Sequence, residues 1–316
     1  MLDNLKCWLA VLRQRIWIWG FRTFYRLTGG WNWRGQSTDV VFSDMRIPAA
    51  TGSVGARLYS SEQGERKPLI VYIHGGGWVV GDLETHHHFC IALSDVSGCT
   101  VVALDYRLAP EHPFPASQDD CLAAIDWLAG NSRDAVLCNG QLIIAGDSAG
   151  GNLATCVCLE LGEDSRQKIE GEILIYPATD HYSAGSGSYV VKAKGQLLTT
   201  DLMVWFWDTY LEKRTGAEPE VQRAFPKRSN SLATLPPTLL ITAENDPLRD
   251  EGRAYAEQLQ QLGVPVTYHH FANAEHGFAC SAGPIDDHQL FMNQLKDWLA
   301  ELDSGEARTL ARNTSQ

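Results

Sequence analysis

The stretch GDSAGG at residues 146–151 directly follows a short apolar run and opens a segment of helical period. A serine at such a strand-to-helix turn is held in a strained backbone conformation with its hydroxyl exposed. Gly146 and Gly150 stand two positions either side of Ser148 and allow the strand and the helix to approach closely. The pattern therefore predicts a nucleophilic serine; a simple glycine-rich turn between strand and helix is the alternative interpretation.

The same turn supplies a hydrogen-bond donor beside the serine. The backbone N–H of Ala149 is unpaired at the start of the expected helix, where negative charge is stabilised. Negative charge would develop at this position when Ser148 attacks a carbonyl carbon. We therefore expect Ala149 to be one donor of an oxyanion hole.

Outward from this turn, short apolar runs alternate with segments of helical period. The expected strands are Asp39–Ile47, Gly55–Tyr59, Leu69–Ile73, Thr100–Leu104, Leu142–Ala145, Ile173–Tyr176, Thr238–Thr242 and Val266–Phe271. The expected helices are His86–Ser97, Ala116–Ala129, Gly150–Leu161, Asp201–Arg214, Asp250–Leu262 and Asp286–Leu302. Short, nearly all-apolar strands that alternate with helices predict a mostly parallel, eight-stranded sheet with helices on both faces.

A glycine-rich loop, HGGGW at residues 74–78, ends the third expected strand. Three consecutive glycines cost backbone entropy and indicate that bare backbone approaches a ligand closely. Ligands bind at the carboxyl ends of strands in α/β sheets, where both this loop and Ser148 lie. We expect the N–H groups of Gly75 and Gly76 to complete the oxyanion hole with Ala149. A phosphate-cradling loop is the alternative, but the loop lacks the ending of a P-loop and the spaced glycines of a dinucleotide site.

A serine hydroxyl needs a base, usually histidine, and the base needs a carboxylate that fixes its tautomer. In chains with this type of serine turn, the order is serine, then acid, then histidine. Asp246 and His276 follow the last two expected strands, so both are predicted at the same rim of the sheet as Ser148. The nearest rival acids are Glu244 and Asp250, which lie at other positions of the same loop.

The remaining histidines and the cysteines do not indicate a metal site. His86, His87 and His88 open a helix beside the glycine loop, and three adjacent helical residues cannot share one metal ion. His74 is expected to orient the glycine loop rather than to act as the base. Because no two cysteines have zinc-site spacing, we expect neither a metal nor a cofactor.

The composition is typical of a soluble globular protein: 316 residues, 44% apolar and 20% charged. The 38 acidic residues outnumber the 26 basic ones, and a surface with a net charge of −12 repels phosphate, which argues against nucleic acid as a partner. No apolar run is long enough for a transmembrane helix. Arg13 and Arg15 interrupt the apolar N-terminus, which is predicted to be mature protein rather than a signal peptide. The eight cysteines are expected to be free buried thiols in a reducing, cytoplasmic compartment.

Six motifs together resemble the hormone-sensitive-lipase family of α/β-hydrolase esterases, particularly its bacterial acetyl-esterase-like members. They are HGGGW at 74–78, GD at 81–82, YRLAPE at 106–111, GDSAGGNLA at 146–154, DPLRDE at 246–251 and HGF at 276–278. The resemblance covers roughly Val40 to Leu302 and implies an α/β-hydrolase fold. It implies Ser148 as the nucleophile, His276 as the general base and Asp246 as its orienting acid. It also implies the oxyanion donors Gly75, Gly76 and Ala149.

The resemblance further implies a domain organisation. Residues 36–302 are expected to form the catalytic domain, and residues 1–35 and 180–225 a helical cap over the site. Residues 303–316 are polar and are expected to be a disordered tail.

The second piece of the expected cap contains the helix Leu202–Leu211, which is apolar nearly all round and must be buried on more than one side. We expect Trp78, Trp205 and Phe206 to line the substrate pocket. Packing between cap and core is the alternative role for any one side chain of this helix.

These inferences predict a serine carboxylesterase that hydrolyses short-chain acyl esters through an acyl-enzyme intermediate. An amidase or a lactonase with the same triad, and a non-catalytic small-molecule receptor with the same fold, are the alternatives. Residues 1–28 are basic and rich in tryptophan, which is also typical of a helix that lies on a membrane surface. The chain is expected to be a monomer, or a homodimer through the exposed edge of the last strand.

Overall fold

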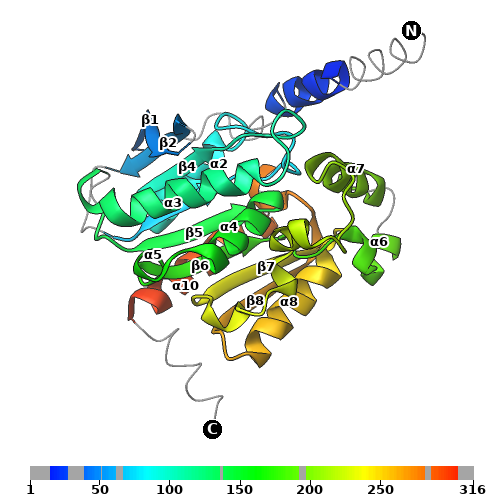
Figure 1. Ribbon diagram of the computed structural model, residues 1–316. Helices are drawn as coiled ribbons and strands as arrows, with labels where there is room; N and C mark the ends of the chain where they lie inside the picture. Colours follow the sequence, from blue (N-terminus) through cyan, green and yellow to red (C-terminus); the bar gives the residue numbers. More distant parts are fainter. Residues whose placement is uncertain are drawn as a thin grey trace.

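The computed structural model describes residues 15–27, 39–50, 52–61, 67–135, 138–191, 197–281 and 286–304. Eight strands form one sheet in the order β1-β2-β4-β3-β5-β6-β7-β8 (Figure 1). They are β1 (Val40–Ala49), β2 (Gly52–Ser61), β3 (Leu69–Ile73), β4 (Val101–Asp105), β5 (Leu142–Asp147), β6 (Ile169–Ile175), β7 (Thr238–Asn245) and β8 (Val266–Glu275). The pairs β1·β2 and β2·β4 are antiparallel and all others are parallel, so the predicted mostly parallel sheet is confirmed.

Helices cover the sheet on both faces (Figure 1). The helices in the described ranges are a helix over residues 15–27, α2 (His87–Ser97), α3 (Ala116–Ala135), α4 (Ala149–Glu160), α5 (Glu163–Arg166), α6 (Gly187–Val191), α7 (Thr200–Tyr210), α8 (Arg249–Gln261), α9 (Phe278–Ser281) and α10 (Asp286–Ser304). Short 3₁₀ helices are η2 (Tyr182–Ala184), η3 (Pro219–Ala224), η4 (Pro226–Arg228) and η5 (Leu232–Thr234).

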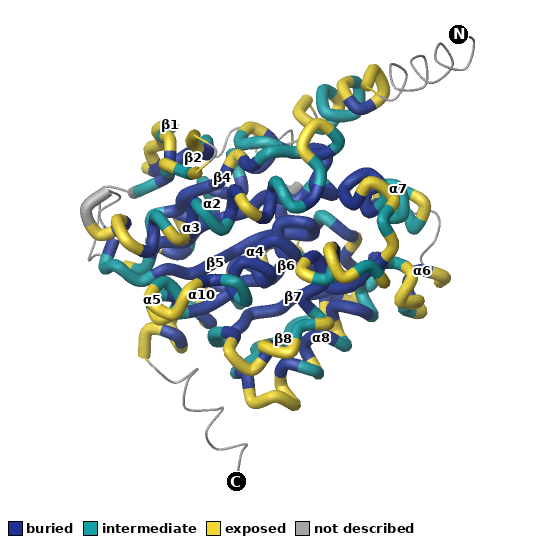
Figure 2. Tube along the Cα trace, viewed as in Figure 1, coloured by how far each residue is buried: buried dark blue, intermediate teal, exposed yellow. Residues whose placement is uncertain are grey.

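The central strands are buried on both sides, as the dark strands in Figure 2 show. In β3, Leu69, Val71 and Ile73 belong to one apolar cluster together with side chains of α3, α4 and α8. Ile70 and Tyr72 point the other way, into a second cluster with side chains of α2 and α10. Burial of both faces explains why β3 is a continuous apolar run in the sequence rather than an alternating one.

The last two strands extend further than the sequence predicts. β7 continues to Asn245 and β8 to Glu275, and these two end residues pair with each other after an irregularity at Ala243. Asp246 and His276 are therefore each the first residue after their strand. Parallel pairing brings these two strand ends to the same rim of the sheet.

The two segments assigned to the expected cap contact each other. The rings of Trp17 and Trp205 lie 4.6 Å apart between centroids, and those of Phe21 and Phe206 lie 6.3 Å apart. Residues 1–14, 28–35 and 192–196 of the expected cap lie outside the described residues, as does the tail from residue 305. α10 continues to Ser304, past the expected start of that tail. No helix in the described ranges combines the length and the apolar character that crossing a membrane requires.

Candidate active site

Ser148 occupies the sharp turn between β5 and α4, with φ at 55° and ψ at −118°. This positive φ is costly for a residue other than glycine, and such strain is typical of functional turns. A Cβ atom at Gly146 would overlap the carbonyl of Gly150, and one at Gly150 would overlap the carbonyl of Ile73. Both flanking glycines are therefore required for the close approach that the sequence predicts.

The three residues of the predicted triad meet at this turn. His276 Nε2 lies 3.0 Å from Ser148 Oγ, and His276 Nδ1 lies 2.7 Å from Asp246 Oδ2. The Asp246 side chain is fully buried, and its other oxygen accepts the backbone N–H of Leu248 at 2.8 Å. The carboxylate is thus held from two sides, with one oxygen facing the imidazole.

This arrangement fixes the tautomer of the histidine. The Asp246 carboxylate only accepts hydrogen bonds, so His276 Nδ1 carries the proton and donates it. Nε2 is then the acceptor that faces the Ser148 hydroxyl. The geometry suits an imidazole that removes the serine proton, while the buried carboxylate stabilises the imidazolium that forms.

The rival acids belong to a separate ion-pair cluster. Glu244 accepts a hydrogen bond from Arg249 at 2.7 Å and pairs with His270 at 3.2 Å. Asp250 accepts from the same arginine at 2.8 Å. Of the three acids considered from the sequence, Asp246 contacts His276.

One predicted oxyanion donor is occupied, and this corrects the sequence interpretation. The N–H of Gly75 donates to Asp147 Oδ1 at 2.7 Å, which removes it from the site. Gly76 and Gly77 line the same cavity as the nucleophile. Their N–H groups, like that of Ala149, have no acceptor within the described part of the chain. The geometry therefore fits Gly76, Gly77 and Ala149 as donors.

Asp147 ties the glycine loop to the nucleophile turn. Its Oδ1 accepts the Tyr72 hydroxyl at 2.5 Å as well as the Gly75 N–H, and lies 3.4 Å from His86 Nε2. Burial alone would raise the pKa of the Asp147 carboxyl, but His86 and the hydrogen bonds from Tyr72 and Gly75 lower that pKa below its ordinary value. The residue before the nucleophile is thus a buried anion that holds the loop.

His74 orients the glycine loop, as the sequence suggests. Its ring stacks on Tyr106 with centroids 4.3 Å apart, and its Nδ1 lies 2.8 Å from the carbonyl of Gly75. Burial, aided by the neighbouring His86, lowers the pKa of His74 to about 4. A neutral ring with the proton on Nδ1 donates to that carbonyl, and His74 makes no contact with the triad.

A cavity of about 310 Å³ opens above Ser148 and His276. Its apolar wall comes from the helix over residues 15–27 and from the segment around α7: Phe21, Phe24, Leu197, Leu198, Leu202, Met203 and Phe206. Its polar end is formed by Tyr25, Thr85, His86, Asp147 and Cys280. The sequence gives no signal for this polar end, because its members come from four separate segments.

Only one of the three predicted aromatic pocket residues lines this cavity. Phe206 does so. Trp78 is fully buried and stacks flat on Tyr210 at 4.6 Å, because the turn after the glycines directs it beneath α7. Trp205 packs edge-on against Trp17 at 4.6 Å. Trp78 and Trp205 therefore join α7 to its neighbours and are not part of the cavity lining.

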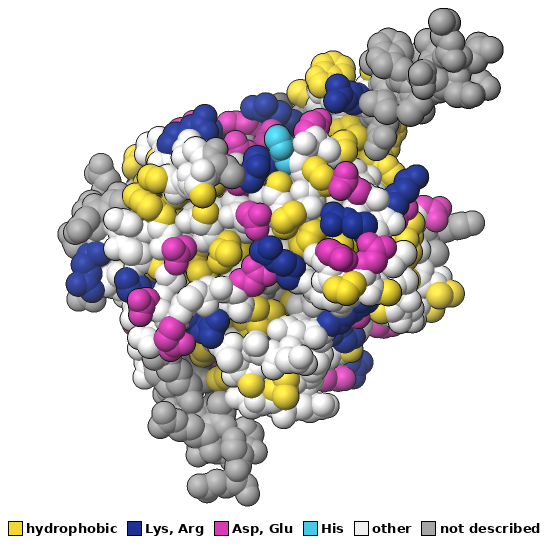
Figure 3. All heavy atoms as spheres, viewed as in Figure 1, with side chains coloured by type: hydrophobic (Ala, Val, Ile, Leu, Met, Phe, Trp, Pro, Cys, Tyr) yellow, Lys and Arg dark blue, Asp and Glu magenta, His cyan; other side chains and the backbone are white. Residues whose placement is uncertain are grey.

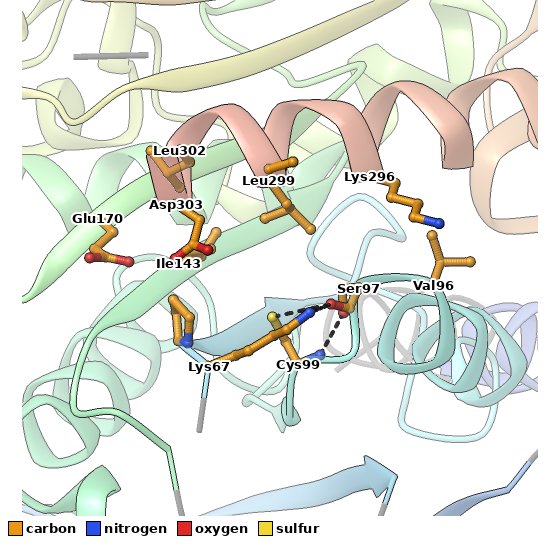
Figure 4. A pocket seen from close by; sticks show the side chains of 12 residues that line it. Lys67, Val96, Ser97, Cys99, Ile143, Glu170, Lys296, Leu299, Leu302 and Asp303 are labelled. Carbon is orange, nitrogen blue, oxygen red and sulfur yellow. Dashed lines mark hydrogen bonds between the residues drawn. The ribbon is translucent and has the colours of Figure 1, made fainter. Parts of the chain in front are cut away.

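A second cavity, of about 220 Å³, lies at the opposite rim of the sheet beneath α10 (Figure 4). Leu299 and Leu302 of α10 face it, and Lys67 donates across it to the carbonyl of Ser97 at 2.8 Å. It borders the amino end of β5 near Ile143, whereas ligands in α/β sheets bind at the carboxyl ends. The triad lies at that other rim.

The chain is similar to proteins of known family. Residues 70–280 match a family model described as the α/β hydrolase fold. The carboxylic ester hydrolase LipN of Mycobacterium tuberculosis is 38% identical over 251 residues, which cover 77% of this chain and 66% of that protein, slightly less than two thirds of its length. Ethyl acetate hydrolase of Pseudomonas putida is 34% identical over 250 residues, or 78% of each chain. A Pyrobaculum calidifontis esterase structure has a TM-score of 0.83 at 35% identity and covers 92% of this chain and 94% of that one.

Proposed function

Because this chain belongs to the α/β hydrolase fold family, we propose that it is a serine carboxylesterase that hydrolyses short-chain acyl esters. The observation that carries the proposal is the unbroken hydrogen-bonded path from Asp246 through His276 to Ser148, which ends in a cavity. The names of its relatives, a carboxylic ester hydrolase and an ethyl acetate hydrolase, support ester bonds as the target.

The reaction begins when Ser148 Oγ attacks the ester carbonyl carbon and its proton passes to His276 Nε2. The carbonyl oxygen becomes an oxyanion, which accepts hydrogen bonds from the N–H groups of Gly76, Gly77 and Ala149. Each such donor contributes roughly 3–4 kcal/mol to the stability of the transition state.

Collapse of this intermediate breaks the bond to the alcohol oxygen, which takes the proton from His276 and leaves. A water molecule then gives a proton to His276 and attacks the acyl-enzyme. The second intermediate releases the acid and returns the proton to Ser148. Asp246 stabilises the imidazolium in both halves of the reaction and stays ionised throughout.

The size of the cavity favours a substrate with a short acyl chain. It has about 310 Å³ of space, and the Phe206 ring narrows it beside Gly77, where a Cβ atom on the glycine would overlap that ring. The contacts between the helix over residues 15–27 and α7 support the cap function expected of the two segments. A cap of this kind excludes water and closes the acyl site.

The test compares the wild type with Ser148→Ala on a series of p-nitrophenyl esters from acetate to laurate. We expect turnover that is highest for the short esters and that is lost in Ser148→Ala, with the circular dichroism spectrum unchanged. A fluorophosphonate probe should label wild-type Ser148. A folded variant that hydrolyses the acetate at the wild-type rate would refute the assignment, and failure of the probe to label would favour the receptor alternative.

Amide and lactone substrates are tested in the same assay, because the triad alone does not select the bond. An amidase or lactonase would turn over the corresponding substrates faster than any ester in the series. The partner that we propose for this chain is a small-molecule ester.

The described cysteines are free buried thiols, which supports a reducing, cytoplasmic location.

The helix over residues 15–27 has large apolar side chains at its surface. Its side chains Trp19 and Leu27 are 70% and 71% exposed, which favours the membrane-surface alternative for this helix, and hydrophobic side chains gather near it in Figure 3. Sedimentation with liposomes tests this contact.

β8 lies at the edge of the sheet, so a homodimer through it would appear as a doubled mass in light scattering, and a monomer as a single mass.

A further inference from the structure

Three buried side chains with metal-ligating atoms meet at the polar end of the substrate cavity. They are His86, Asp147 and Cys280, and their exposed fractions are 3%, 4% and 7%. The imidazole nitrogen, the carboxylate oxygen and the sulfur all lie within 4.8 Å of one another. Each residue comes from a different segment: the turn before α2, the end of β5, and α9.

We propose that His86, Asp147 and Cys280 form a binding site for a divalent zinc-like cation, which inhibits the enzyme when it binds. Imidazole, carboxylate and thiolate are the three ligand types of zinc sites in proteins. Bonds of about 2.0–2.3 Å place the ligand atoms of a tetrahedral site roughly 3.3–3.8 Å apart. His86 Nε2 and Asp147 Oδ1 are already separated by 3.4 Å. Cys280 Sγ lies within 4.8 Å of both, so an approach of no more than about 1.5 Å by the sulfur completes this set.

The surroundings provide access and a fourth ligand. All three side chains line the cavity that contains Ser148, so a hydrated ion reaches them from the substrate side. The Tyr72 hydroxyl lies 3.5 Å from Cys280 Sγ and 2.5 Å from Asp147 Oδ1, which is too close to that carboxylate oxygen for a second ligand of a tetrahedral site. A water molecule from the cavity therefore fills the fourth position. Burial raises the pKa of the Cys280 thiol, and a bound cation displaces the thiol proton to water in the cavity as the metal–sulfur bond forms.

Inhibition follows from the hydrogen bonds of Asp147, and this part of the inference rests on the proposed function. Asp147 Oδ1 accepts the Gly75 N–H, which fixes the glycine loop that carries the oxyanion donors. A cation bound to this oxygen competes with that N–H and with the Tyr72 hydroxyl. The ion also occupies the polar end of the cavity, one residue from Ser148. Both effects lower turnover.

The sequence alone could not indicate this site. His86, His87 and His88 are adjacent on the chain and point in different directions, which argues against one shared metal. The fold instead brings His86 to a carboxylate and a thiol that are remote in sequence. This set of ligands can be recognised only in the folded structure, in which the start of α2, the end of β5 and α9 lie close together.

The first experiment titrates Zn²⁺ against ester hydrolysis by the wild type, Cys280→Ala and the control Cys156→Ala, each relative to its own metal-free rate. Cys156 is a buried thiol of α4 that does not line the cavity. We expect EDTA-reversible inhibition of the wild type and of the control. For Cys280→Ala, the half-inhibiting Zn²⁺ concentration should rise at least about tenfold, since it loses one of three ligands. Mg²⁺, which prefers oxygen ligands, should not inhibit.

The second experiment measures binding without turnover, in Ser148→Ala. Co²⁺ added to this variant should produce the near-ultraviolet sulfur-to-cobalt charge-transfer band of thiolate ligation, and Zn²⁺ should abolish it. The band should be missing from Ser148→Ala/Cys280→Ala. Because no ester is hydrolysed, the result stands apart from the proposed esterase function.

Equal Zn²⁺ inhibition of the wild type and Cys280→Ala, or no thiolate band with Co²⁺, would overturn the proposal and indicate binding at His276. If Cys280→Ala does not fold, as judged by circular dichroism, His86→Gln replaces it in both experiments. That variant keeps the thiol but loses the imidazole, so a wild-type response to Zn²⁺ would again be contrary to the proposal.

Discussion

Glu172 of β6 gives the most quantitative prediction about this fold. Its side chain is fully buried on the α4 side of the sheet, where Thr238 Oγ1 donates to Oε2 at 3.4 Å. Oε1 has no partner among the described residues. Burial raises the pKa of Glu172 from its ordinary 4.5 to about 8, against a smaller opposing effect of the neighbouring hydroxyls of Thr155 and Thr238.

The consequence for stability follows from proton uptake on folding. The unfolded carboxyl ionises near pH 4.5, whereas the folded one keeps its proton up to about pH 8. Between these two values the folded state binds more protons at Glu172, so the contribution of Glu172 to the free energy of unfolding falls as the pH rises and levels off above pH 8. At about 1.4 kcal/mol per pH unit, the interval of roughly 3.5 units corresponds to about 5 kcal/mol.

Glu172→Gln imitates the protonated side chain at every pH and removes this loss. The stability of the variant relative to the wild type should increase by about 5 kcal/mol between roughly pH 4.5 and pH 8. With an unfolding entropy of about 2.1 cal/mol/K per residue, this corresponds to a relative gain of about 7 °C in melting temperature. Glu251, whose pKa burial also raises to about 8, titrates in both proteins and cancels in the difference.

The assay is thermal or urea unfolding of both proteins across this pH range. Glu301→Gln, a substitution of an exposed residue on α10, is the matched control and should give a flat difference curve. A difference between Glu172→Gln and the wild type that stays constant to within about 1 kcal/mol would mean that the folded carboxyl ionises within about one pH unit of its ordinary pKa of 4.5. Burial would then not raise the pKa of Glu172, contrary to this prediction.

Three further substitutions test the site and its surroundings. Asp246→Asn should lower kcat by about 10⁴-fold, as in the serine-protease triad, because an amide stabilises the wrong tautomer of His276; a kcat within tenfold of the wild type would contradict this role. Phe206→Ala should raise kcat/KM for long acyl esters relative to acetate, since Phe206 narrows the cavity. Trp78→Ala should leave that ratio unchanged but lower the free energy of unfolding by about 3–5 kcal/mol, because it removes a fully buried ring. A change of ester preference in Trp78→Ala would place this residue back in the pocket.

The fold could be predicted because its signals are local and repeated. Each central strand is buried on both faces and so reads as an apolar run, and the serine turn marks one strand end unambiguously. The expected α/β-hydrolase fold and its family are confirmed by the matched family model and by structures of similar esterases. Strand ends are less predictable, because β7 and β8 continue through polar residues up to Asn245 and Glu275.

The proximity of Ser148, Asp246 and His276 could also be predicted, because parallel strands place their carboxyl ends at one rim of the sheet. The pocket lining could not be predicted in this way. Trp78, Trp205 and Phe206 are all large aromatic residues, and residue type alone does not distinguish cavity lining from packing. For Trp205 and Phe206, the sequence does not indicate which face of α7 turns to the cavity. The wall contributed by Phe21 and Phe24 depends on how the helix over residues 15–27 packs, and such packing has no local signal.

Which of the three loop glycines can bind an oxyanion depends on which of their N–H groups donates to the buried carboxylate of Asp147. Asp147 is anionic and enclosed, so it requires hydrogen bonds, and the N–H of Gly75 supplies one of them. A Cβ atom on Gly75 would overlap this carboxylate, so the first glycine is needed for that contact rather than for catalysis. The donors left for an oxyanion are then one residue further along, at Gly76 and Gly77. The geometry thus fits a structural role for Gly75 and, in the proposed esterase, an oxyanion-binding role for Gly76 and Gly77.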